Sequence, residues 1–447
     1  MSGPDPGALA EQVEAKMAKY LVPGVAVGVL DADGPRAWGF GSTNVDHPLP
    51  VEGDTVFEIA SITKTMTATV AARLAAEGKL DLDAPVRKYL PEFAVADPGV
   101  SARVTVRDLF THTAGWFGEH LAPTGRGDDA IAKGVAAMAG LEQLAPAGVF
   151  SYNNVSLIVA GRVIEVTSGR PYRDAVRDLL FAPLGMTHSA FDAADVLYER
   201  LAAGHTVRDG AAVRVRARLS ESTNGDPVGG VRSTANDLLR YARFHLGDGT
   251  APDGTRLLPA RALAAMREPR VQIGPAGHVG LAWFLDERGG VRTAGHGGAT
   301  VAHMSQLTMV PERGAAFVIL TNGANGVRIC AELQEWLLRS WLGLAPRPRP
   351  AALEPQPDVR PFAGRYWAPL SDIELAAEDG ALVLRLTWKG TVAERPTPPP
   401  LRLAFIGPDT VAAADPSDAP PVGDFLRGPD GSVAYFRWGS RARKKIG

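Results

Sequence analysis

The 447-residue chain has a single cysteine, Cys330. One thiol can form no internal disulfide, and a thiolate-rich metal site is excluded. The net charge of −2 gives no reason to expect nucleic acid or an anionic membrane as a partner. No run of residues is long and apolar enough to span a bilayer. The first residues include Asp5, Glu11 and Glu14 but no apolar segment, so we expect no secretory signal and a cytoplasmic location.

Histidine is also sparse, with nine residues in the whole chain. They share no ligand spacing with one another or with carboxylates, so we expect no metal site and no cofactor. His112 and His303 are accordingly expected to be structural.

The residues that are abundant describe a globular protein. Hydrophobic residues make up 45% of the chain and charged residues 21%, which is typical of a protein with a large core. A chain of this length predicts two domains. Apolar patterns predict a helix over 9–21, strands over 24–30 and 37–41, a long helical stretch, strands over 279–286, 304–310 and 315–321, and a helix over 327–342. This order predicts an α+β fold in which helices pack on an antiparallel sheet.

The chain changes character at the proline-rich stretch 345–350, which is a stiff spacer. Beyond it, short alternating runs on both sides of Asp379-Gly380 indicate a hairpin, and more short runs follow. They predict a small all-β barrel of about ninety residues. We therefore divide the chain into a domain over 1–344, a linker over 345–358 and a barrel over 359–447.

The barrel sequence ends in a basic segment that we expect to be a solvated tail. Its members are Arg437, Arg441, Arg443, Lys444 and Lys445. An alternative has Arg441 reach across to bind a substrate carboxylate, because a planar guanidinium suits that task.

The stretch around Ser61 is a candidate nucleophile site. Ile62, Met66 and Val70 recur every four residues and predict a helix with one apolar face, with Ser61 in its first turn. Lys64 follows three residues later, so its amine projects from the same side as the Ser61 hydroxyl. A desolvated lysine can take the proton of a serine and activate it. The alternative for this pair alone is a capping serine beside a solvated lysine.

Two further stretches could complete such a site. Tyr152 and Asn154 precede a predicted helix and could present a phenol and a carboxamide to a cleft, although such residues also cap or pack. His296-Gly297-Gly298 lies between two predicted strands. A plain hairpin would explain it, but so would a strand edge that a substrate approaches closely and where an N–H binds an oxyanion.

Together these motifs resemble the serine β-lactamase and penicillin-binding-protein superfamily, particularly its class C and esterase-like branch. That family combines S-x-x-K, Y-x-N and a third motif of K-T-G or H-x-G type, here Ser61/Lys64, Tyr152/Asn154 and His296-Gly297-Gly298. Secondary signatures are similar at 111–115, 229–234 and 320–323. The resemblance covers roughly residues 8–343, and it implies a β-lactamase/transpeptidase-like fold.

The resemblance also implies roles for these residues. Ser61 becomes acylated, with Lys64 and Tyr152 as the base system; which of the two takes the proton first stays open because coupled groups titrate jointly. The N–H groups of Ser61 and Ala299 would hold the oxyanion. Asn154 would bind the substrate amide or steady Lys64.

Two other residues could shape the substrate site. His296 stands where many relatives have lysine, which disfavours a dedicated β-lactamase and favours a neutral or switchable hydrogen-bond donor. Trp116 either lines the cleft or packs.

The combination of features is most like penicillin-binding-protein-type thioesterases, which cyclise nonribosomal peptides head to tail. The sequence Phe362-Ala363-Gly364-Arg365-Tyr366 resembles the entry to lipocalin-like domains found in some relatives. The substrate would be a peptide or ester, possibly brought as a thioester by a carrier protein. A D-aminopeptidase, carboxylesterase or β-lactamase-like hydrolase is the alternative, and a non-catalytic sensor is a third reading.

Overall fold

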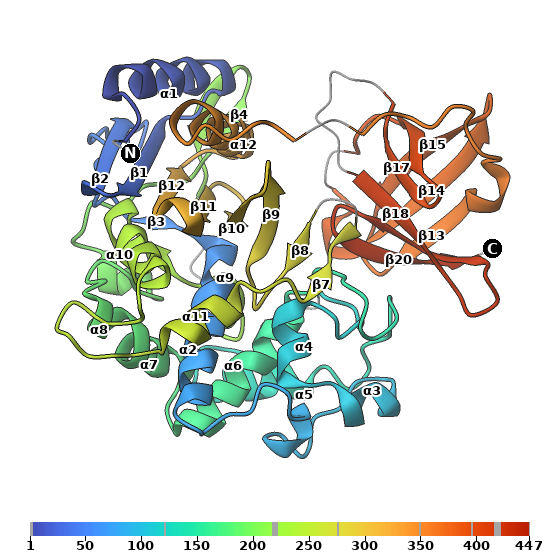
Figure 1. The fold of residues 1–447 in the computed structure, drawn as a ribbon, viewed down its shortest axis with the longest axis horizontal. Helices are drawn as coiled ribbons and strands as arrows, with labels where there is room; N and C mark the ends of the chain where they lie inside the picture. The colour runs from blue at the N-terminus through green and yellow to red at the C-terminus, as the bar shows by residue number, and fades with distance from the viewer. Residues whose placement is uncertain are drawn as a thin grey trace.

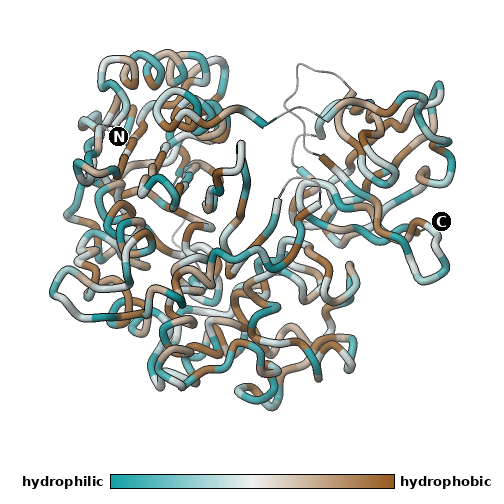
Figure 2. Tube along the Cα trace, viewed as in Figure 1, coloured by the Kyte–Doolittle hydropathy of each residue, from teal (hydrophilic) through white to brown (hydrophobic). Residues whose placement is uncertain are grey.

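The computed structural model describes residues 3–119, 122–216, 222–274, 277–347, 350–394, 397–414 and 422–446. It contains an α+β domain built on an eight-stranded sheet and, beside it, a closed β-barrel (Figure 1). Both features confirm the predicted fold class. Each unit has its own hydrophobic core, and hydrophobic stretches occur along the trace of both (Figure 2).

The sheet has the strand order β2-β1-β12-β11-β10-β9-β8-β7, and all its neighbouring strands are antiparallel. Its strands are β1 Gly24–Asp31, β2 Gly34–Gly41, β7 Val271–Gln272, β8 His278–Val279, β9 Phe284–Arg288, β10 Val291–Ala299, β11 Met304–Val310 and β12 Ala315–Thr321. The strands predicted over 304–310 and 315–321 are confirmed. The single strand predicted over 279–286 is wrong, because Ala282 adopts a left-handed conformation (φ 58°) and breaks it into β8 and β9.

Helices cover both faces of the sheet. On one face, α1 (Pro6–Tyr20) packs beside α12 (Gly326–Trp336); on the other lie α10 (Ala235–Leu246) and the helical region. That region contains α2 Thr63–Ala76, α3 Pro98–Arg103, α4 Val106–Thr111, α5 Ala130–Ala136, α6 Val155–Ser168, α7 Tyr172–Val176, α8 Ala182–Leu184, α9 Asp226–Gly229 and α11 Ala260–Met266. Short strand pairs complete the domain: β3 Phe57–Glu58 with β6 Arg232–Ser233, and β4 His205–Arg208 with β5 Ala211–Arg214.

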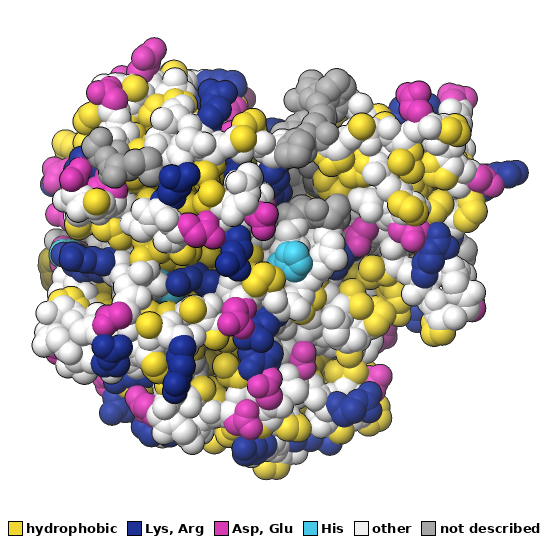
Figure 3. Space-filling view, in the orientation of Figure 1, with side chains coloured by type: hydrophobic (Ala, Val, Ile, Leu, Met, Phe, Trp, Pro, Cys, Tyr) yellow, Lys and Arg dark blue, Asp and Glu magenta, His cyan; other side chains and the backbone are white. Residues whose placement is uncertain are grey.

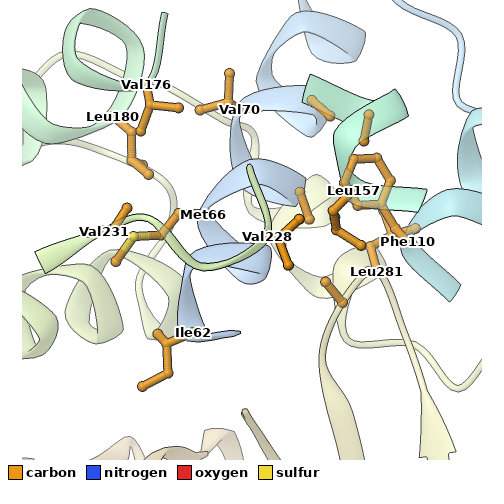
Figure 4. Packing of buried hydrophobic residues seen from close by; sticks show 14 of the residues in the cluster. Ile62, Met66, Val70, Phe110, Leu157, Val176, Leu180, Val228, Val231 and Leu281 are labelled. Atoms are coloured by element: carbon orange, nitrogen blue, oxygen red, sulfur yellow. The ribbon is translucent and has the colours of Figure 1, made fainter. Parts of the chain in front are cut away.

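Helix α2 is buried on nearly all sides, so the prediction of a single apolar face is wrong. Ile62, Met66 and Val70 are buried as expected, and neighbours such as Leu180 and Phe110 lie on opposite sides of the helix (Figure 4). The remaining faces carry buried threonines whose hydroxyls bond to backbone carbonyls of the preceding turn. Because these hydroxyls are satisfied, polar positions can enter the core.

The barrel closes from β13 to β20, each strand pairing antiparallel with the next. Its strands are β13 Gly364–Ala368, β14 Ser371–Glu378, β15 Ala381–Trp388, β16 Leu401–Gly407, β17 Thr410–Ala413, β18 Val422–Arg427, β19 Val433–Trp438 and β20 Arg441–Ile446. Its interior is filled by an aromatic cluster that includes Phe362, Tyr366, Phe405, Phe425 and Phe436. A likeness to lipocalins stays a prediction.

The prediction that the basic segment at the end of the barrel is a solvated tail is wrong. Arg441 begins β20, which closes the barrel against β13, and both Arg437 and Arg443 are buried. The strand is needed to satisfy the open edge of the sheet, so its basic side chains are held in fixed positions.

The predicted linker falls between Trp341, where the last helical turn of the α+β domain ends, and Gly364, where β13 begins. Pro348 and Arg349 of the spacer lie outside the described residues. None of the helices in the described ranges has the length and apolar character needed to cross a bilayer. On the face shown in Figure 3, basic and acidic side chains are interspersed, in keeping with the small net charge.

Asn322 ties strand β1 to the segment after β2. Its side chain is fully buried: Oδ1 accepts from the N–H of Gly24 (2.8 Å), and Nδ2 donates to the carbonyls of Ser42 and Thr43 (both 3.1 Å). Asn322→Ala would remove the acceptor of the buried Gly24 N–H and the donor to Ser42, while the Thr43 carbonyl keeps the N–H of Ala203 (2.9 Å), so we expect the free energy of unfolding to fall by about 2–4 kcal/mol in a denaturant titration. Asn325→Ala removes one exposed hydrogen bond and should cost less than about 1 kcal/mol. Equal losses would contradict this role of Asn322.

Candidate active site

The candidate nucleophile lies in a strained turn. Ser61 occupies a 3-10 turn, Ala60–Ile62, directly before α2, and its side chain is half-buried. Ala60 has a φ of 46°, a left-handed conformation that is costly for a residue other than glycine. Such strain persists only where the surroundings enforce it, and here β10 and α9 pack against the turn.

Lys64 is fully buried and faces this serine. Its Nζ lies 2.8 Å from the Oγ of Ser61 and 2.7 Å from the carbonyl oxygen of Val228. Burial, and after it the positive charge of Arg441, hold the pKa of Lys64 well below its ordinary value. The lowered pKa favours the neutral amine, which can accept a proton from Ser61.

Tyr152 approaches the same serine from the mouth of α6. Its ring centroid lies 5.3 Å from Lys64 Nζ, 4.5 Å from the centroid of the His112 ring and 6.0 Å from that of the Phe284 ring. Burial raises the pKa of Tyr152 to about 12, against the lowering effects of Ser61 and Arg441. At neutral pH the phenol therefore keeps its proton, so the electrostatics favour Lys64 as the first proton acceptor.

His296 sits on β10 with both ring nitrogens buried. Burial, together with the charge of Lys64, lowers the pKa of His296 to about 3, so the ring is neutral at physiological pH. Nδ1 lies 2.6 Å from the carbonyl oxygen of Gly297, a distance that fits an Nδ1–H donor, and this tautomer leaves a lone pair on Nε2. With the ring neutral and its N–H directed to Gly297, Nε2 is an acceptor in this structure, and the role of His296 as a neutral or switchable hydrogen-bond donor to a substrate stays a prediction.

The glycines of this motif permit a close backbone approach. A Cβ on Gly298 would lie 2.1 Å from the carbonyl oxygen of Ile59, and Ser305 Oγ donates to that same oxygen (2.9 Å). The end of β10 is thereby held against the turn that carries Ser61. The assignment of the Ser61 and Ala299 N–H groups as oxyanion donors stays a prediction.

The structure separates the two asparagines after Tyr152. Asn154 begins α6 without capping it, and its carboxamide has no hydrogen-bond partner among the described residues. It is thus available to a substrate amide, whereas Lys64 bonds to Ser61 and Val228 and not to Asn154. The buried Asn153, which was not predicted, donates to the carbonyl of Trp116 (2.8 Å) and accepts from the N–H of Ser156 (2.9 Å).

Trp116 and Arg441 lie behind the tyrosine. Trp116 is 1% exposed and packs on Phe93, so its side chain has little surface to offer a substrate. Arg441 comes from the barrel: its guanidinium lies 5.0 Å from the centroid of the Tyr152 ring and pairs with Glu119 (2.9 Å). The alternative in which Arg441 reaches across the domains is correct for its position, while its binding of a substrate carboxylate stays a prediction.

Sequence reasoning missed other contributors because they carry no motif. The carbonyl of Val228 is one, and the ring of His112, which was expected to be only structural, contacts Tyr152. A cavity of about 290 Å³ also opens beside the nucleophile turn, where it is lined by Glu58, Val228 and Thr300. Its charged lining is balanced between arginines and carboxylates, namely Arg126, Arg173 and Arg232 with Glu58, Asp192 and Asp226.

Among the described residues no cluster of side chains is arranged to hold a metal ion.

The comparison with known families agrees with this geometry. The family model described as Beta-lactamase matches residues 9–335. The chain belongs to this family. It is 36% identical over 370 residues to penicillin-binding protein 4 of Amycolatopsis lactamdurans. That alignment covers 80% of this chain and 96% of the relative. The family consists of serine hydrolases and acyl-transfer enzymes, so this protein is a serine enzyme of that kind.

Two other similarities extend into the barrel. The chain is 25% identical over 409 residues to the unguisins hydrolase ungD′ of Aspergillus campestris, covering 88% of this chain and 73% of the relative. The crystal structure of SurE matches with a TM-score of 0.79 at 27% identity, over 98% of this chain and 99% of that chain. The same protein with D-Leu matches with a TM-score of 0.75 at 25% identity and the same coverage.

The charge of Arg441 gives a testable pH dependence. If neutral Lys64 accepts the proton of Ser61, kcat/KM is retained above the pKa of Lys64 and is lost as the pH falls through it. Arg441→Gln removes a charge that lowers this pKa, so we expect the acidic limb of the profile to move to higher pH. A neutral p-nitrophenyl ester is the appropriate substrate, because it has no carboxylate for Arg441 to bind.

Arg385→Gln is the matched control, since Arg385 forms an exposed ion pair with Glu378 on the barrel. We expect its profile to overlay that of the unmodified protein. An acidic limb that stays in place, or moves to lower pH, in Arg441→Gln would contradict the proposed influence on Lys64.

Proposed function

We propose that this protein is a stand-alone penicillin-binding-protein-type thioesterase that joins the two ends of a linear nonribosomal peptide. The observation that carries the proposal is the extent of the match to SurE, which covers the acylation site and the barrel together. A hydrolase of the same superfamily is the alternative.

The geometry supports an acylation step by the residues in hand. Lys64 accepts the proton of Ser61 as Oγ attacks the thioester carbonyl, and the oxyanion is bound by the N–H groups of Ser61 and Ala299. Collapse expels the thiolate, which takes up a proton from the base system to become the free thiol, and leaves an ester on Ser61. In the second half the amino terminus of the same peptide attacks this ester, and its proton returns through Tyr152 and Lys64 to Oγ.

Cyclisation needs both ends of one substrate in one site, which replaces amine concentration by proximity. The cavity beside the nucleophile turn offers about 290 Å³ and a lining of both charges, which could receive part of a peptide attached to Ser61. The D-Leu in the SurE structure is a property of that protein, and it favours a D-configured residue at the acyl position here. Delivery by a carrier protein and a cytoplasmic location belong to the same proposal, with no role for nucleic acid or a membrane.

The hydrolase alternative rests on the similarity to the unguisins hydrolase. It differs only in the group that releases the acyl chain, which would be water. A non-catalytic sensor is disfavoured because binding alone does not need a base, and burying Lys64 against Ser61 is costly.

A linear peptidyl thioester with a D-residue at its carboxyl end distinguishes these functions. We expect a product lighter than the linear acid by one water, formed by the unmodified protein and absent with Ser61→Ala. The same peptide with an acetylated amino terminus should yield linear acid alone. Linear acid as the sole product from the free amine would contradict the cyclase and support the hydrolase.

A further inference from the structure

Three consecutive residues that end in Tyr152 are bound by the barrel. Arg437 Nη1 donates to the carbonyl of Phe150 (2.8 Å), and the N–H of Ala442 donates to Ser151 Oγ (3.1 Å). The main-chain N–H of Tyr152 itself donates to the carbonyl of Ser440 (2.8 Å). The segment that carries the catalytic phenol is therefore held from outside its own domain.

The barrel element that makes these bonds is rigid. Gly439 and Ser440 join β19 to β20 and both have positive φ (59° and 67°), which fits the tight two-residue hairpin turn that matches strand twist. Arg437 is fixed by two bonds to the Asp424 carboxylate (2.8 and 2.6 Å) and is 8% exposed. A guanidinium locked in this way presents its remaining donor in a single direction.

The α+β domain holds the same segment from its other side: the N–H of Ser151 donates to the carbonyl of His112 (2.9 Å), and the Phe150 ring packs on His112 and Phe284. Toward the barrel, a cavity of about 370 Å³ lies in the seam, lined by Gly148, Phe150, Gln272, Asp424 and Arg437. Because the seam is not filled there by side chains, the polar bonds from the barrel are what hold the Phe150–Tyr152 backbone on this side.

We propose that the β19–β20 hairpin is a working part of the active site and that Arg437 is a positioning residue, which acts through Phe150 and Tyr152 on proton transfer at Ser61. The inference needs only acylation of Ser61, so it holds whether an amine or water releases the acyl group. It assigns the barrel a function in the reaction itself. A displacement of about 1 Å at a catalytic group can cost a hundredfold in rate.

The test compares two arginines of the barrel that make the same set of contacts. Arg427 also forms two bonds to a carboxylate, Asp409 (3.0 and 2.6 Å), donates to a carbonyl, Gly431 (2.8 Å), and lies over a phenylalanine ring. Its carbonyl partner, however, belongs to the barrel. Arg427→Met therefore removes the same kinds of bond, from an arginine side chain that is 44% exposed against 8% for Arg437, without touching the catalytic segment.

The measurement is the acylation burst with a p-nitrophenyl ester, recorded over a range of ester concentrations. For Arg437→Met we expect the maximal burst rate to fall at least about tenfold, while the ester concentration at half-maximal rate changes less than about twofold. Arg427→Met should stay within about twofold of the unmodified protein in both quantities. Arg437→Lys, which restores a donor beside Phe150, should recover part of the loss.

A double-variant comparison separates positioning from general stability. In the Tyr152→Phe background, Arg437→Met should lower the residual rate by less than about twofold, because the hydroxyl it positions is gone. A tenfold loss that persists in that background, or a burst rate in Arg437→Met like that of the unmodified protein, would overturn the proposal.

Ser151→Ala provides the comparison if Arg437→Met does not fold. It removes the acceptor for Ala442 while leaving the barrel intact, and we expect a loss of at least about threefold that also disappears with Tyr152→Phe. An unchanged rate in Ser151→Ala would overturn the proposal. If the ester is neither hydrolysed by the unmodified protein nor adds an acyl mass at Ser61, acyl transfer at Ser61 is overturned as well, whereas products of peptide release bear only on the cyclase.

Discussion

The structure depends on a lysine that is buried without a carboxylate partner. Lys64 has two oxygen acceptors, Ser61 Oγ and the carbonyl of Val228, and no exposed surface. A buried ammonium in such surroundings is costly, and deprotonation removes most of that cost. The fold thus makes the neutral, proton-accepting form of the lysine the stable one.

This burial explains why α2 is surrounded on all sides. The helix must place Lys64 inside the domain, so α6, α7, α9 and α11 pack around it. The carbonyl that receives Lys64 is fixed by its neighbour, since Thr67 Oγ1 shares its proton between the carbonyls of Pro227 (2.9 Å) and Thr63 (3.1 Å) and lies 2.8 Å from the Tyr172 hydroxyl. The buried threonines of α2 therefore serve the geometry of the site as well as the core.

The barrel contacts the site through polar groups and not through a shared hydrophobic core. Its interior is closed by its own aromatic cluster, so it meets the α+β domain through polar groups along the β19–β20 hairpin. Hydrogen bonds and ion pairs fix direction more sharply than apolar contact does. The charge of Arg441 reaches both Tyr152 and Lys64 across this seam, which makes the electrostatics of the site a property of both domains.

The sequence by itself determined the local features. Strand β12 was predictable because its apolar run is nearly continuous, and Ser61, Lys64, Tyr152 and His296 were identifiable because their chemistry imposes fixed spacings. Only the tertiary structure decided the contacts between residues distant in the chain. The burial of α2, the carbonyl of Val228 and the place of Arg441 over Tyr152 leave no periodic or compositional signal. The basic composition of the last segment predicts a solvated tail. The segment becomes a strand because the barrel would otherwise have an unpaired edge, and that edge exists only when the other strands are in place.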